Sequence, residues 1–140
     1  MATAQVGRMR FFRLLEDEDL ADTIKKKAEE AGVKAGLLLV IGSLKKVVLG
    51  YYRGGIYENL ILPGPLEIAS GIGNIATSEK GEVMIHLHLV VTNEKGAAFG
   101  GHLMKGSPVG ATAELIIIEA ANMNLIRAFD EKTKLNLLKL

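Results

Sequence analysis

The chain contains no cysteine, and only 5% of its 140 residues are aromatic. Without cysteine it can form neither disulfides nor thiolate metal sites, and it has no thiol nucleophile. Because 49% of the residues are nevertheless hydrophobic, the core must consist mainly of leucine, isoleucine, valine and alanine. A chain of this length can bury a core without covalent cross-links, and we expect a single domain over residues 1–140.

The chain also lacks a large excess of charge and a long hydrophobic run. Its 17 basic and 16 acidic residues give a formal net charge of +1, which supplies no long-range field for a polyanion such as DNA. No apolar run approaches the roughly 18 residues that span a bilayer. The first residues, MATAQVGRMRFF, contain no signal-peptide core. We therefore expect a soluble, cytoplasmic protein with no membrane partner.

One helix is expected near the N-terminus, in the segment EDEDLADTIKKKAEEAG. The apolar residues at helical spacing are Leu20, Ile24, Ala28 and Ala31, and Gly32 supplies a stop signal. Acidic residues crowd the start of the segment and lysines follow, which suits the helix dipole. This helix is expected to be scaffold that lies on a sheet.

Strands are expected through the rest of the chain, because short turn-like segments separate its apolar runs. Reversals at GSLKK, RGG, PGP and SEKG favour antiparallel pairing, and hence an α+β domain with a mostly antiparallel sheet of about seven strands. The C-terminal segment LIRAFDEKTKLNLLKL fits either a short strand or a helical turn. The expected strands are 35–43, 45–52, 56–62, 66–77, 82–92, 97–104 and 112–120.

Two of the expected strands, AGLLLVIGS and ELIIIEA, do not alternate between apolar and polar residues. Such strands are covered on both faces by a helix, another sheet or another subunit, and a homo-oligomer is favoured. The glycine-rich segments SGIGNIA and GAAFGGHLMKG fit neither a Walker loop nor a dinucleotide fingerprint, since strand-like sequence continues after each. Their glycines instead indicate bulges or a close approach of neighbouring backbones.

All three histidines of the chain fall between residues 86 and 102, and they form its main candidate site. His86 and His88 alternate in the apolar strand VMIHLHLVV, so both point to one face, with α-carbons roughly 6 to 7 Å apart. The turn-like NEKG predicts a hairpin that returns His102 of FGGHLMKG to the pair. Three neutral imidazoles and a water form a familiar open zinc site. The same pattern also fits packed or hydrogen-bonded histidines without a metal.

A family resemblance covers nearly the whole chain. The helix DLADTIKKKAEEAG, then AGLLLVIGSLKKVVLGYY, PLEIASGIGNIA, MIHLHLVV, GGHLMKG, TAELIIIE and RAFDEKT follow one another as in a plants-and-prokaryotes-conserved (PPC) domain. The combination of HLHL, GGHL and TAEL in this order is the specific part of the resemblance.

The resemblance implies a homotrimer and a metal site at the histidine motifs, with His86, His88 and His102 as ligands of zinc or another divalent metal. It also implies a DNA-associated or regulatory binding module. This chain lacks an AT-hook, since Arg53-Gly54-Gly55 has no Arg-Gly-Arg-Pro core, and Gly64 to Ala69 replace the plant partner motif. Direct DNA binding is therefore not implied by the residues.

The fold of the family is also similar to that of acetolactate decarboxylase, so the alternative function is a small zinc-dependent enzyme acting on a keto or ester substrate. Glu114 or Arg127 would be its acidic or basic helper. Both residues also fit structural roles, with Arg127 pairing with Asp130 at the C-terminal turn.

Overall fold

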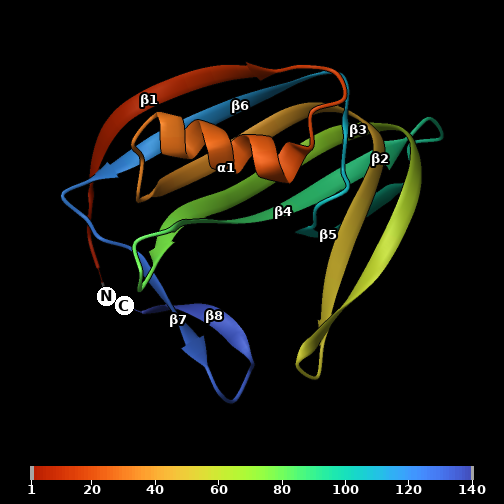
Figure 1. The fold of residues 1–140 in the computed structure, drawn as a ribbon. Coiled ribbons are helices and arrows are strands. Elements are labelled where there is room, and N and C mark those ends of the chain that lie inside the picture. Colours follow the sequence, from red (N-terminus) through yellow and green to blue (C-terminus); the bar gives the residue numbers. More distant parts are fainter. Residues whose placement is uncertain (1, 140) are drawn as a thin grey trace.

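The computed structural model describes residues 2–139, and within this range it contains eight strands and one α-helix. Figure 1 shows the helix lying across one side of a long, curved sheet, while two hairpins project from the opposite end of the molecule. The elements in chain order are β1 (Gln5–Leu14), α1 (Leu20–Glu30), β2 (Gly36–Arg53), β3 (Ile56–Ser78), β4 (Val83–Asn93), β5 (Ala98–Leu103), β6 (Val109–Ala121), β7 (Ile126–Asp130) and β8 (Leu135–Lys139).

All eight strands belong to one sheet, in the order β1-β6-β2-β5-β4-β3-β7-β8, with an additional pairing between β2 and β3. This additional pairing closes a ring, because β2 pairs with β3, β3 with β4, β4 with β5, and β5 again with β2. Every pairing between these strands is antiparallel except that of β3 with β7. The ring brings residues that are distant in sequence to one place, and the histidines lie on it.

The expected number of strands was wrong. The ranges 35–43 and 45–52 form the single strand β2, and 56–62 and 66–77 form the single strand β3, because GSLKK and PGP produce irregularities in the pairing rather than reversals. Three further strands, β1, β7 and β8, lie outside the seven expected ranges. The C-terminal segment forms strands, which resolves the alternative of strand or helical turn.

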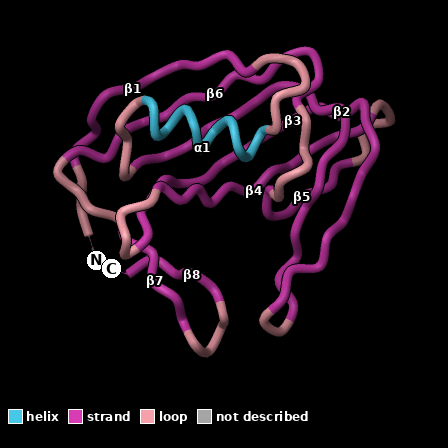
Figure 2. The backbone as a smooth tube through the Cα atoms, viewed as in Figure 1, coloured by secondary structure: helices cyan, strands magenta, loops and turns pink. Residues whose placement is uncertain are grey.

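The core lies between α1 and the sheet. Leu20, Ile24 and Ala28 are fully buried, as the helical spacing predicts, and they pack with inward-facing sheet residues such as Leu87 and Leu115. Burying one such leucine stabilises the fold by about 1.5–3 kcal/mol. Figure 2 shows this helix as the sole helical layer among the residues described, so it covers just one face of the strands.

Asp19 fixes both the start of α1 and the loop that follows β5. One carboxylate oxygen accepts a hydrogen bond from the backbone N–H of Asp22 at 3.1 Å, which caps the helix. The other accepts from the backbone N–H groups of Gly106 and Ser107, at 2.7 and 3.0 Å. A single side chain therefore ties the helix to the segment between β5, which carries His102, and β6.

The face of the sheet opposite α1, called here the open face, carries exposed apolar side chains. A row of directly paired residues crosses it from β1 to β4. Within this row, Phe11 is 70% exposed and Ile72 is 56% exposed. The row consists of Phe11, Ile116, Leu39, Ile72 and His88.

No helix among residues 2–139 is long and apolar enough to cross a membrane.

Candidate metal centre

The alternation along β4 separates the histidines from the core. Leu87 and Leu89 are each 1% exposed and face α1, whereas His86 and His88 point to the opposite side of the strand. Their imidazoles meet there, with Nε2 of His86 and Nε2 of His88 at 3.2 Å. The prediction that both rings share one face is confirmed.

The hairpin between β4 and β5 brings the third histidine to the same place. His102 lies directly opposite His88 in the register of the two strands. The turn is held by Asn93, whose side-chain oxygen accepts from the backbone N–H groups of Lys95 and Ala97, both at 3.0 Å. The hairpin expected from NEKG is therefore present, and it determines the position of His102.

The three imidazoles have the geometry that a metal requires. One ring nitrogen from each of His86, His88 and His102 lies within 4.8 Å of the other two. The nitrogens of a tetrahedral zinc site lie about 3.3 Å apart when the Zn–N bonds are about 2.0–2.1 Å long, close to the separation of His86 and His88. Among the residues described, Nδ1 of His102 is buried and has no hydrogen-bond partner. The donor set therefore fits zinc.

The surroundings of His86 and His102 favour the neutral form of both rings. The pKa of His102 is lowered to about 4, chiefly by burial and then by His86, His88 and Arg127, in that order. Burial also lowers the pKa of His86, with Arg127 and His88 as smaller causes. Neutral imidazoles keep the lone pair that a metal ligand needs.

Strand β3 supports the histidines from the other side of β4. Gly73 pairs with Leu87, and a Cβ at this position would overlap the carbonyl oxygen of His86. Only glycine permits such a close approach of the two backbones. The expectation that SGIGNIA marks a close approach is confirmed, and the neighbouring Asn74 pairs directly with His86.

Tyr57 is part of the site, although sequence reasoning did not identify it. Its ring lies against the imidazole of His102, with centroids 5.1 Å apart and an interplanar angle of 33°. Gly50 of β2 makes room for it, since a Cβ there would lie 2.8 Å from Cδ1 of Tyr57. Nothing in the local pattern signals this contact, because it arises from the pairing of β2 with β3.

Arg127 of β7 also reaches the histidines. Its NH1 group donates to the carbonyl oxygen of Asn136 at 3.0 Å, and NH2 donates to the side-chain oxygen of Asn74 at 2.8 Å. NH2 lies 3.2 Å from Nδ1 of His86. The expected pairing of Arg127 with Asp130 is wrong. Asp130 accepts from the backbone and hydroxyl of Thr133, and these bonds lower the pKa of its carboxyl group.

The contact with Arg127 defines the proton position on His86. A guanidinium group can only donate, so Nδ1 of His86 is the acceptor and the proton of the neutral ring lies on Nε2, which faces His88. Histidines that bind metals usually donate their second ring N–H to an acceptor. A metal bound at Nε2 of His86 would therefore change the contact between this ring and Arg127.

Two cavities flank the histidine cluster. One of about 600 Å³ is lined by Tyr51, Ile72, His88 and His102, and one of about 210 Å³ is lined by Tyr57, Met84, His86 and Arg127 among others. Neither cavity has an aspartate or glutamate among the described residues that line it.

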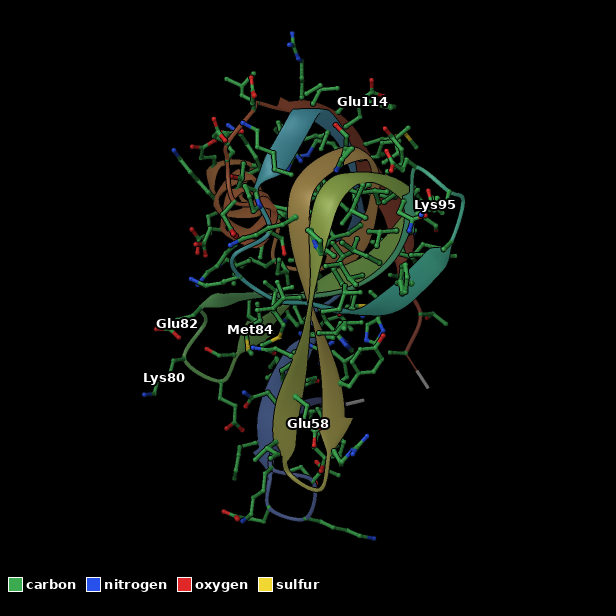
Figure 3. All side chains as sticks on the ribbon, turned by 90° about the vertical axis from the view of Figure 1, so that its right-hand side faces the viewer. Glu58, Lys80, Glu82, Met84, Lys95 and Glu114 are labelled. Carbon is green, nitrogen blue, oxygen red and sulfur yellow. The ribbon has the colours of Figure 1, made fainter. Side chains whose placement is uncertain are left out.

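Glu114 does not take part in the site. It is exposed on the open face, where it pairs with Ile41 of β2 and Arg13 of β1. Figure 3 shows it at the opposite end of the molecule from Glu58, which lies near the tip of the β2–β3 hairpin. Of the two helpers named from the sequence, the structure brings only Arg127 to the histidines.

The fold and the site define a small α+β module in which three histidines gather on a ring of paired strands. The family profile of the Plants and Prokaryotes Conserved (PCC) domain matches residues 1–121. The chain belongs to this family, called PPC above, as its motifs predict.

Two solved structures resemble the chain over nearly its whole length. A plant- and prokaryote-conserved (PPC) protein from Pyrococcus horikoshii is 30% identical, with a TM-score of 0.92 and coverage of 100% of this chain and 96% of that one. A metal-containing protein from Archaeoglobus fulgidus is 31% identical, with a TM-score of 0.88 and coverage of 98% and 96%.

A curated relative is much longer than this chain. The bifunctional protein GlmU of Synechococcus sp. (strain JA-3-3Ab) is 29% identical over 130 residues, which are 91% of this chain and 20% of that protein. The chain thus spans about a fifth of the length of this relative.

More distant structures show the fold alone. Proteins from Bacteroides thetaiotaomicron and Ralstonia eutropha, described as candidate DNA-binding proteins, are 18% and 24% identical to this chain. The expected similarity to acetolactate decarboxylase is weak. A Staphylococcus aureus protein described as similar to that enzyme is 15% identical, with a TM-score of 0.53 and coverage of 84% of this chain and 54% of that one.

Proposed function

We propose that this PPC domain is a regulatory binding module that holds one zinc ion through His86, His88 and His102. The observation that carries the proposal is the convergence of one ring nitrogen from each histidine within 4.8 Å. In addition, Nδ1 of His102 is buried without a partner among the residues described. When bound, the metal supplies an open Lewis-acid position for an oxygen ligand. The metal-containing relative from Archaeoglobus fulgidus supports the same interpretation.

The metal is tested by measuring the zinc content of untagged protein, since a polyhistidine tag would add ligands. We expect about one zinc per chain in the wild type and its loss in each of His86→Ala, His88→Ala and His102→Ala. Thr92→Ala is the matched control, because Thr92 lies on the same face of β4 and keeps all three ligands. Wild-type protein that stays zinc-free after incubation with zinc would overturn the proposal.

We further propose that the module assembles as a homotrimer through the open face. Exposed apolar side chains occupy this face, and a groove of about 530 Å³ runs between residues such as Phe11, Ile41 and Ile72. Large exposed apolar patches mark interaction surfaces. Light scattering after size exclusion should give three times the mass of the 15.0 kDa chain. Phe11→Glu should reduce the measured mass to that of a single chain, while Phe129→Glu on β7 should leave the mass unchanged.

Any association with DNA should pass through an assembly or a partner rather than through direct phosphate contacts. The net charge is +1, and several exposed cations are already paired: Lys45 with Glu16 and Asp17, and Lys105 with Asp22. A gel-shift series at about 50 mM salt, where phosphate contacts are strongest, tests this. A shift that weakens steeply with salt would contradict it.

A second candidate, a zinc-dependent enzyme acting on a keto or ester substrate, is favoured by the cavities beside the histidines. The binding module is preferred because no carboxylate among the described residues lines either cavity to act as acid or base. Incubation of zinc-loaded protein with 2-acetolactate and simple esters decides between them, with chelator and His88→Ala as controls. Metal-dependent turnover would favour the enzyme.

A further inference from the structure

We propose that Arg127 binds the carboxylate of a small organic acid in the cavity beside the histidines. The proposal concerns the same place as the proposed metal, but it rests on a different observation, the environment of the guanidinium group. That group is inside the protein, next to a cavity, and lacks a counter-ion among the residues described.

Arg127 is a buried charge without an anionic partner. The residue is 8% exposed, and its hydrogen-bond partners among residues 2–139 are a carbonyl, an amide oxygen and an imidazole nitrogen, all of them neutral. Asp130, the acidic residue nearest to it on β7, is bound by Thr133 instead. A buried charge is costly unless it is paired, so this arginine is poised to gain from an anion.

The guanidinium also retains unused donors. It has five N–H groups, of which three are directed to Asn136, Asn74 and His86. Nε of Arg127 is buried and has no partner within the described part of the chain. Buried donors are normally satisfied, so a donor left over on a residue that lines a cavity indicates a missing acceptor.

The cavity selects the kind of anion. Its volume of about 210 Å³ suits a small molecule, and Arg127 is the only charged residue in its described lining. One positive group matches one negative charge, which favours a carboxylate over a phosphate monoester. The planar fork of arginine also fits a carboxylate in two-point contact. The lining also includes the apolar side chains of Met84, Ile85, Leu135 and Leu137, which would receive an apolar tail.

His86 links this anion site to the metal. Its Nδ1 accepts from Arg127 while the ring proton lies on Nε2. If a metal takes Nε2, the proton of the neutral ring moves to Nδ1 and this hydrogen bond is lost. The freed N–H of Arg127 then becomes available to a ligand, so the carboxylate should bind more tightly to zinc-loaded protein than to zinc-free protein.

The test is a titration with propanoate, using its uncharged amide, propanamide, as the matched control. Calorimetry and the side-chain Nε–H resonance of Arg127 in ¹⁵N spectra are followed in zinc-loaded and chelator-treated protein. We expect propanoate to bind and to shift this resonance, and propanamide to do neither. Arg127→Lys should weaken binding about tenfold, because it keeps the charge but loses the fork. Arg53→Met, an exposed arginine at the tip of the β2–β3 hairpin, should bind as the wild type does.

The outcomes separate this proposal from the zinc proposal. Propanoate binding that depends on Arg127 in zinc-free protein would support the anion site even if zinc never bound. Equal binding of propanoate by zinc-loaded wild type and Arg127→Met would overturn it, since the metal alone would then hold the acid. An Arg127 resonance that does not move at saturating propanoate would also overturn the proposal. This measurement uses wild-type protein, so it does not depend on whether a variant folds. Tighter binding of inorganic phosphate would overturn the choice of carboxylate.

Discussion

The two faces of β4 show how one strand serves two purposes. Under α1, Leu87 and Leu89 are each 1% exposed and belong to the apolar core. On the other side, His86 and His88 lie beside cavities, an unpartnered imidazole nitrogen and a buried cation. The first face has the features that stabilise a fold, and the second has features that cost stability unless a ligand satisfies them. Changes to the two faces should therefore have separable effects.

The largest effect on folding should come from Leu87→Ala. Removing a fully packed leucine leaves a cavity and should lower the free energy of unfolding by about 2–5 kcal/mol, measured by denaturant titration. The matched change on the open face, Ile72→Ala, should cost far less in a single subunit because Ile72 is 56% exposed. Folded Leu87→Ala protein should still bind zinc, and loss of zinc from it would show that the two faces are not separable.

Gly73→Ala should affect both faces at once. The added methyl would overlap the backbone of His86 and press β3 away from β4. We expect a loss of about 1–3 kcal/mol in the free energy of unfolding, together with weaker zinc binding. Gly81→Ala tests the specificity of this effect, because nothing lies within 4 Å of a Cβ there, although its positive φ adds some strain. Unchanged zinc affinity in Gly73→Ala would contradict the role given to this close approach.

A smaller effect should appear as a dependence of stability on pH in zinc-free protein. The pKa of His102 is about 4 in the folded protein, against an ordinary pKa of 6.5. Between about pH 4 and 6.5 the unfolded chain therefore binds more protons than the folded chain. The free energy of unfolding should therefore fall as the pH falls from about 6.5 to 4, and this contribution should level off below 4. His102→Gln should flatten the slope in part, since His86 shifts in the same direction. A slope identical to that of the wild type would refute this assignment.

The smallest effect should come from the exposed ion pairs, which belong to neither face. Lys45 lies 2.7 Å from Glu16 and from Asp17, with all three side chains exposed to solvent. Such pairs contribute little because water and salt screen them. Lys45→Ala should leave the unfolding midpoint at high salt unchanged and bind zinc normally. A large loss of stability at high salt would show a role beyond this ion pair.

Much of the candidate site could be predicted because it depends on local pattern. Strand alternation places His86 and His88 on one face, and the turn in NEKG returns His102 to them. Strand boundaries were harder to predict. GSLKK and PGP carry turn-like residues, yet long-range pairing between β2 and β3 continues through both. Tyr57 was missed for the same reason, because its contact with His102 requires this pairing.

The sequence by itself determined the family, the helix, the apolar core and the histidine hairpin, because helical spacing, strand alternation and short turns act over a few residues. The tertiary structure decided what surrounds the histidines. Closure of the ring by β5 and β2 positions Tyr57 next to His102, and the parallel contact of β7 with β3 brings Arg127 to His86 rather than to Asp130. These neighbours come from distant segments, and only the packing of the whole sheet determines which side chains meet.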